Sequence, residues 1–168
     1  MLVYGDQNRR VRPADLLAEA RADLARGERL SALIGLGQLA QGLADLEFAE
    51  RGADARSPAQ TAVMGALTAL ARSLYPAHSR DSGNPGRSSS SSEEAWVAAL
   101  AGLSDEPGVW RPTEIEVRIP EGFAFYALHP DLYAAAARRL PPGDWRVIGL
   151  RSIGTSLAAV AAAALGAP

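Results

Sequence analysis

The stretch Arg146-Val-Ile-Gly-Leu-Arg-Ser-Ile-Gly-Thr-Ser-Leu-Ala-Ala-Val-Ala-Ala-Ala-Ala-Leu-Gly-Ala-Pro168 decides the fold expected for this chain. Its pattern predicts a short buried strand at Arg146–Leu150, a polar turn containing glycine at Arg151–Ser156 and an apolar helix at Leu157–Leu165. A strand that turns tightly into a helix directs unpaired backbone N–H groups at one point, where the partial positive charge of the first helical turn favours an anion. The stretch therefore predicts a phosphate-binding turn.

The residues upstream of this stretch supply the other parts of a sheet. Apolar and charged side chains alternate over residues 115–119, which predicts a half-buried strand. The nearly continuous apolar run at residues 123–128 predicts a second strand, and the two can pair as a hairpin. A short helix at Asp131–Leu140 then leads to the strand at Arg146–Leu150. Strands and helices in succession favour a parallel pair joined by a right-handed crossover.

The N-terminal part of the chain, residues 1–76, is predicted to be mainly helical. Leucines recur at helical spacing in two segments between residues 13 and 50, and Ser57-Pro58 is a favourable start for a third helix. Residues 77–111, which include a serine-rich tract, are interpreted as a flexible linker or an insertion. The expected fold class is therefore α/β: an N-terminal helical segment followed, over residues 112–168, by a partial mixed or parallel sheet with a crossover helix.

The composition of the 168-residue chain excludes several kinds of chemistry. It contains neither lysine nor cysteine, so a lysine Schiff base, a P-loop lysine, a disulfide and a thiolate nucleophile are all ruled out. Its two histidines are too few for a histidine-based metal cluster. The net charge of -2 favours neither nucleic acid nor an anionic membrane as a partner. The N-terminus lacks a signal-peptide pattern and the alanine-rich C-terminal run is too short to span a bilayer, so we expect a cytoplasmic location.

The residue types in the predicted turn suit a phosphate group. Arg151 offers a planar, permanently charged fork, and Gly154 permits a positive φ or a close approach of the backbone to a ligand. Thr155 and Ser156 offer hydroxyls. The same residues also fit an ordinary strand-to-helix turn in which a hydroxyl caps the helix. The turn is neither a Walker loop, which needs a Gly-Lys pair, nor a dinucleotide-binding fingerprint.

The segment Val147–Leu165 resembles the first strand–helix unit of phosphoribosyltransferase-like proteins of the type I fold. In that family an apolar strand with an internal glycine enters a short loop, and a helix rich in small residues follows. The resemblance extends over about residues 112–168, and the segment Pro120–Pro130 is similar to the stretch upstream of the loop in some bacterial members. It implies that five residues form the loop binding the pyrophosphate of phosphoribosyl pyrophosphate, chiefly through backbone amides. These are Arg151, Ser152, Ile153, Gly154 and Thr155.

The resemblance also implies an activity and a cofactor. Complete members use magnesium and transfer a phosphoribosyl group between pyrophosphate and a base or similar acceptor, as transferases of nucleotide metabolism. Their signature, a later strand with two adjacent acidic residues and a Thr/Gly-rich loop for the ribose 5'-phosphate, does not follow before Pro168, and the acidic pair Glu93-Glu94 follows a serine tract instead. We expect an N-terminal portion that is inactive by itself, because the missing contacts orient the reacting carbon.

Two other interpretations stay open. Residues 13–75 offer a leucine-rich amphipathic surface, and an unfinished sheet has an edge that lacks a partner, so the chain also fits a non-enzymatic helical protein-interaction module. A homo-oligomer or a protein partner is compatible with this interpretation. The chain also fits a truncated remnant, since residues 78–106 resemble translated copies of a dispersed bacterial repeat element.

A further candidate is the pair His129 and Asp131, which lies near the expected end of a strand. The two side chains suit acid/base chemistry. The simpler interpretation is that Asp131 caps the following helix and His129 is a loop residue.

Overall fold

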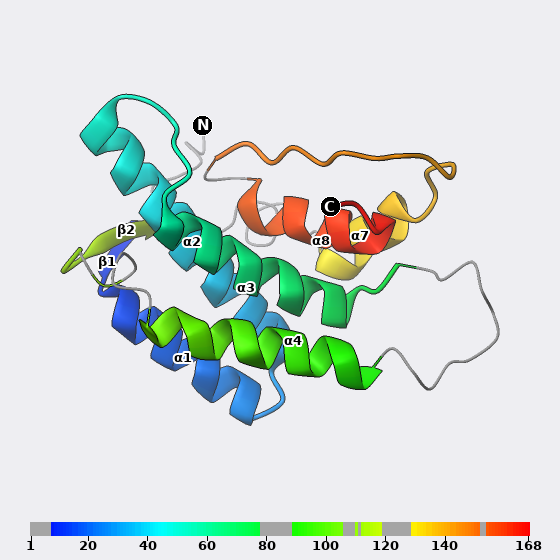
Figure 1. Ribbon diagram of the computed structural model, residues 1–168, viewed down its shortest axis with the longest axis horizontal. Coiled ribbons are helices and arrows are strands. Elements are labelled where there is room, and N and C mark those ends of the chain that lie inside the picture. Colours follow the sequence, from blue (N-terminus) through cyan, green and yellow to red (C-terminus); the bar gives the residue numbers. More distant parts are fainter. Residues whose placement is uncertain (1–7, 78–88, 106–109, 111, 119–128, 152–153) are drawn as a thin grey trace, which may run out of the picture.

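The fold, taken from a computed structural model, is described for residues 8–77, 89–105, 110, 112–118, 129–151 and 154–168. This part of the chain is mostly helical with a small sheet (Figure 1). In chain order the elements are β1 (Asn8–Val11), α1 (Pro13–Ala25), α2 (Arg29–Arg51), α3 (Pro58–Leu74), α4 (Ser89–Gly102), a 3-10 turn (Leu103–Asp105), β2 (Ile115–Arg118), α7 (Pro130–Ala137) and α8 (Thr155–Leu165).

The long helix α2 is central to the packing, since α1, α3, α8 and β2 all contact it. Figure 1 shows α1 and α4 on one side of α2 and α3, with α7 and α8 on the other. The helix α4 lies within residues 77–111 and packs against α3 through its buried Trp96 and Leu100. The interpretation of the surrounding segment as an insertion stays a prediction.

The start and end signals in the sequence place the helices of the N-terminal part. Ser57 accepts a hydrogen bond at its Oγ from the Gln60 N–H at 3.0 Å, and Pro58 occupies the first turn of α3, as the sequence predicted. The helix α2 ends at Gly52, whose φ of 70° is the left-handed conformation favoured by glycine. These helices bury a leucine-rich core, and each fully buried leucine contributes roughly 1.5–3 kcal/mol relative to an exposed one.

Two glycines of α2 let other elements approach it closely. A Cβ at Gly42 would lie 2.8 Å from Ile115 Cδ1, and a Cβ at Gly37 would lie 2.8 Å from Ser156 Cβ. Such distances are shorter than carbon atoms tolerate, so β2 and α8 can contact α2 only because these positions lack side chains. The helix continues unbroken through both glycines.

The strand predicted from the alternating pattern at residues 115–119 is confirmed as β2. Ile115 and Val117 are buried against α2, while Glu116 and Arg118 are exposed. Its partner is β1, which pairs with it in antiparallel register, and the sequence did not predict that strand. The strand expected at residues 123–128 lies outside the described residues.

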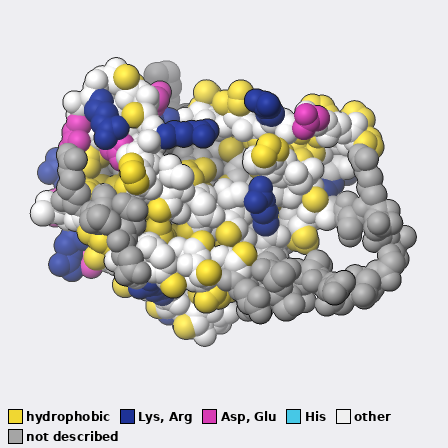
Figure 2. Space-filling view, in the orientation of Figure 1, with side chains coloured by type: hydrophobic (Ala, Val, Ile, Leu, Met, Phe, Trp, Pro, Cys, Tyr) yellow, Lys and Arg dark blue, Asp and Glu magenta, His cyan; other side chains and the backbone are white. Residues whose placement is uncertain are grey.

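The strand predicted at Arg146–Leu150 is wrong. The segment 146–150, called the extended segment below, carries no strand assignment and runs along the surface (Figure 1). Ile148 is 88% exposed and Leu150 is 75% exposed, and Figure 2 shows apolar side chains along this upper edge of the molecule. A strand needs a neighbour to hold its backbone hydrogen bonds, and no described segment pairs with this one. Within the described residues the sheet is therefore antiparallel and small, and α7 joins no parallel pair.

None of the helices in the described part of the chain combines the length and the apolarity required to cross a bilayer.

Candidate anion-binding site

Gly154 is the N-cap residue of α8, with φ -90°. Its N–H donates to the Leu150 carbonyl at 2.7 Å, and its own carbonyl accepts from Ala158 N–H at 2.8 Å. Among the described residues, no side chain caps the first turn of α8. The N–H groups of the residues that follow Gly154 are the donors that a helix leaves without a backbone partner at this end.

Glycine is required at position 154 by a close approach and not by a positive φ. A Cβ at this position would lie 2.6 Å from Leu150 N and 2.9 Å from Leu150 O. Any side chain would therefore push the extended segment away from the start of α8.

A cavity of about 520 Å³ opens beside this turn, between α2, α3, α8 and the extended segment. Of the five residues predicted to bind pyrophosphate, Arg151 and Thr155 line it. Gly154 lies next to Thr155 at the helix start, while Ser152 and Ile153 are outside the described residues. The Ser156 side chain is buried against α2 at Gly37, so Thr155 brings a hydroxyl from the start of α8 to the cavity.

The charge of Arg151 is already balanced by two carboxylates. Its Nη1 lies 3.3 Å from Asp45 Oδ1 and its Nε lies 3.2 Å from Asp54 Oδ1. Its guanidinium also lies over the Phe48 ring, 3.8 Å from the ring centroid. These contacts fix the turn to the C-terminal half of α2. A phosphate at Arg151 would have to compete with both carboxylates.

Arg56 is the cation of the cavity that the sequence did not single out. It lies in the loop before α3, lines the same cavity and is exposed. In the part of the chain that the structure describes, its guanidinium forms no ion pair and no hydrogen bond. An unpaired arginine at a cavity mouth is suited to phosphate oxygens. The signal missed in the sequence is a basic residue directly before the helix-starting Ser57-Pro58.

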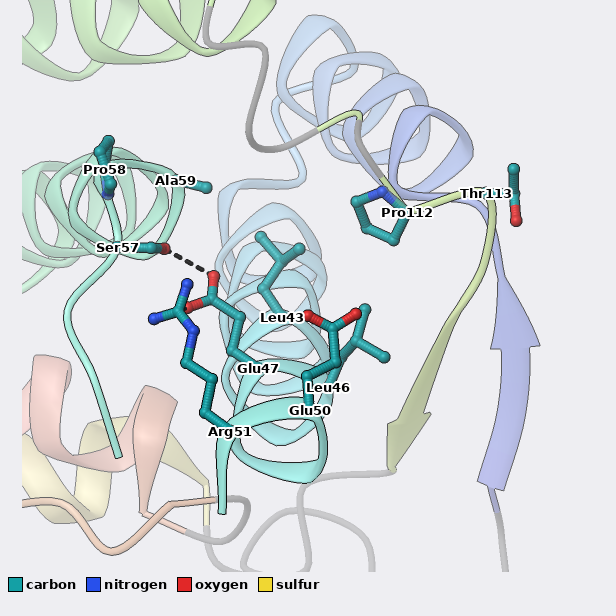
Figure 3. A pocket seen from close by; sticks show the side chains of 10 residues that line it. All are labelled: Leu43, Leu46, Glu47, Glu50, Arg51, Ser57, Pro58, Ala59, Pro112 and Thr113. Carbon is teal, nitrogen blue, oxygen red and sulfur yellow. Dashed lines mark hydrogen bonds and ion pairs between the residues drawn. The ribbon is translucent and has the colours of Figure 1, made fainter. Parts of the chain in front are cut away.

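A second cavity, of about 400 Å³, lies where α2 ends and α3 begins (Figure 3). Ser57 Oγ donates to Glu47 Oε1 at 2.6 Å, a hydrogen bond that Figure 3 marks with a dashed line. Arg51 Nη1 lies 3.3 Å from Glu47 Oε2. Since these polar groups bind one another, they join the two helices and leave few polar atoms available to bind a ligand.

The pair His129 and Asp131 has a structural role in the fold. His129 is the N-cap of α7, with Nδ1 accepting from Asp131 N–H at 3.3 Å, so the expectation that Asp131 caps this helix is wrong. Asp131 Oδ1 instead accepts from Tyr75 Oη at 2.9 Å, which ties α7 to the end of α3. Burial is the main cause that raises the pKa of Tyr75 above its ordinary value, and this hydrogen bond is the second.

Among the described residues, no group of three or more acidic, histidine or cysteine side chains is placed to hold a metal ion. Asp45 and Asp54, the carboxylates nearest the turn, converge on Arg151 instead.

Comparison with known proteins adds no family to this description: no family model, no curated protein and no solved structure matches the chain.

Proposed function

We propose that this chain binds a diphosphate at the start of α8, in the manner of a phosphoribosyltransferase-like protein that takes phosphoribosyl pyrophosphate. The observation that carries the proposal is the cavity shared by Thr155, Arg151 and the unpaired Arg56. Its volume of about 520 Å³ falls within the range of small-molecule sites, roughly 300–1,000 Å³. Because the described residues directly before the turn form no strand, the proposal rests on this cavity and on the start of α8.

The residues of the chain divide the work of binding. Unpaired amides of the first turn of α8 donate to phosphate oxygens, with the Thr155 hydroxyl as a further donor. Arg56 supplies positive charge without first having to leave a carboxylate. Arg151 fixes the turn against Phe48 and α2, and reaches the anion only by exchanging one carboxylate for a phosphate.

Magnesium enters this proposal with the ligand. A diphosphate carries the cation on its own oxygens, and the metal there neutralises phosphate charge. We expect no turnover by the chain alone, since the acidic pair and the Thr/Gly-rich loop of the resembling family are not recognised in its sequence. We also propose that the chain works in the cytoplasm.

We also propose that the extended segment can form the parallel sheet expected from the sequence. The extended segment would become a strand only if another extended stretch paired with it, and residues 123–128 are the apolar run that the sequence offers. Because α7 lies between the two in the chain, such a pair would be parallel with a helical crossover.

A second candidate function is favoured by one observation. Ile148 and Leu150 are among the most exposed large apolar side chains described, and they lie on a segment that pairs with no described strand. Such a segment suits strand addition by a protein partner. This is the interaction-module alternative, and it requires no phosphate site.

Calorimetric titration with inorganic pyrophosphate and with phosphoribosyl pyrophosphate, each with and without magnesium, tests the proposal. We expect saturable heat at submillimolar ligand, and Arg56→Ala to weaken binding about tenfold, as expected for a lost charged hydrogen bond of roughly 1.4 kcal/mol. Arg139→Ala is the matched control, because Arg139 is an exposed arginine in the turn after α7 and lines none of the cavity. Absence of heat at millimolar ligand would reject the phosphate site and leave the interaction module.

A further inference from the structure

The cavity beside α8 extends far beyond the turn. On α3, Gln60, Met64 and Thr68 follow one another at four-residue spacing, so they form one row about 12 Å long. Residues of α8 from Thr155 to Ala162 line the opposite wall. A diphosphate fills only part of such a groove.

The two helices run in the same direction along the groove, which fixes its two ends. Arg72 Nη2 donates to the Ala167 carbonyl at 3.1 Å, so the last residues of the chain lie beside the end of α3. The start of α8 therefore lies beside the start of α3, near Gln60. Thr68, Ala162 and Pro168 line the other end.

These two ends differ in charge. All charged side chains that line the cavity belong to the loop before α3 or to the turn before α8: Asp54, Arg56 and Arg151. The rest of the lining is apolar, except for the uncharged polar side chains of Gln60, Thr68 and Thr155. In the described part of the chain, the side-chain amide of Gln60 and the hydroxyl of Thr68 have no hydrogen-bond partner. They can therefore bind heteroatoms of a ligand without giving up a contact.

We infer that the face of α3 formed by Gln60, Met64 and Thr68 determines specificity by holding an uncharged, largely apolar organic group of the phosphorylated ligand. The inference rests on the proposed function, because the phosphate end sets where that group lies. A second phosphate is disfavoured at the far end, since burial beside alanine and methionine without a cation costs free energy. A planar ring is the group we propose for this end, because Met64 and Ala162 line it with apolar surface and Thr68 adds a hydroxyl.

The experiment compares inorganic phosphate with phenyl phosphate, which differ only by a ring, and uses inorganic pyrophosphate as the probe of the charged end. We expect phenyl phosphate to bind about tenfold more tightly than phosphate, as burial of a ring predicts. Ala162→Leu should fill the far end and abolish that advantage while leaving pyrophosphate affinity unchanged. Met64→Trp is a second blocking variant from the other wall, so the test survives if one variant fails to fold.

Ala135→Leu is the control, because it adds the same bulk at an exposed site on α7 that lines no part of the cavity. Circular dichroism establishes that each variant is folded. If pyrophosphate binds but phenyl phosphate binds no better than phosphate, the inference is wrong and the phosphate site stands. If the blocking variants lower the affinity for pyrophosphate and for phenyl phosphate equally, the groove has no separate apolar end and the inference is also wrong. If pyrophosphate fails to bind the unmodified chain, the proposed function falls and takes the inference with it.

Discussion

The strand β2 and the extended segment both present isoleucine at the edge of the helical body, but their surroundings are opposite. Ile115 of β2 is 2% exposed against α2 and belongs to a strand paired with β1, whereas Ile148 is 88% exposed on a segment with no described partner strand. The first region stabilises the fold, and the second leaves apolar surface and backbone groups beside the candidate site. Apolar side chains of this chain are thus buried where a second strand pairs with their segment, and exposed where no described segment does so.

The largest expected effect comes from truncating the two isoleucines separately. Ile115→Ala should lower the free energy of unfolding by about 2–5 kcal/mol, because it opens a cavity in the core. Ile148→Ala should change it by less than about 0.5 kcal/mol, since an exposed side chain loses little on truncation. Urea unfolding followed by circular dichroism measures both. Equal losses would mean that the extended segment packs as tightly as β2.

The next effect concerns the glycine beneath β2. Gly42→Ala should destabilise the protein by about 1–3 kcal/mol, because its Cβ would approach both Ile115 and the Glu116 carbonyl, the latter at 3.2 Å. Gly65→Ala is the matched change on α3, where a Cβ meets nothing within 4 Å, and it should stabilise by about 0.5–1 kcal/mol. Thermal melts of the two variants should move in opposite directions. Shifts of the same sign would contradict the close packing of β2 on α2.

A smaller effect is expected where the turn is fixed to α2. Arg151→Met removes two partly exposed ion pairs and the contact with Phe48, and should lower the free energy of unfolding by about 0.5–1 kcal/mol. Arg9→Met removes an exposed ion pair with Glu19 and should leave the free energy of unfolding unchanged. Unfolding at low and at high salt separates the two. If Arg9→Met were the more costly change, the turn would not be held as described.

The smallest effect is a pH dependence at the other end of α3. The pKa of Tyr75 is raised in the fold, so the unfolded chain loses this proton first, near the ordinary tyrosine value of about 10. The contribution of this group is fully present below that pH and declines as the pH rises above it. Thermal melts between pH 8 and 11 should show a steeper decline for the unmodified chain than for Tyr75→Phe. Parallel curves would remove Tyr75 from the pH dependence.

The sequence predicted what depends on local signals and missed what depends on distant partners. The spacing of leucines predicted the two helical segments that are α1 and α2, Ser57-Pro58 predicted the start of α3, and alternation predicted β2. Because β1 is far from β2 in the chain, its pairing leaves no local pattern. The strand predicted at residues 146–150 failed for the same reason: Val, Ile and Leu favour a strand, but only a neighbour makes one.

The same distinction between local signals and distant partners holds for the candidate site. The apolar helix was predicted from its local pattern at Leu157–Leu165, and α8 begins two residues earlier, at Thr155, so that Thr155 and Ser156 belong to the helix and not to the turn. The approach of Arg56 to that turn, and the pairing of Arg151 with Asp45 and Asp54, result from tertiary packing of α2 and α3 against α8. No spacing within the C-terminal stretch indicates either contact.

The most direct test of the central claim is a titration of the isotopically labelled chain with inorganic pyrophosphate, followed by amide NMR. We expect the largest shifts on the amides of Thr155 to Leu157, with the Arg56 side-chain signals moving in step at the same midpoint. Shifts confined to other parts of the chain, or spectra unchanged at millimolar pyrophosphate, would contradict an anion site at the start of α8.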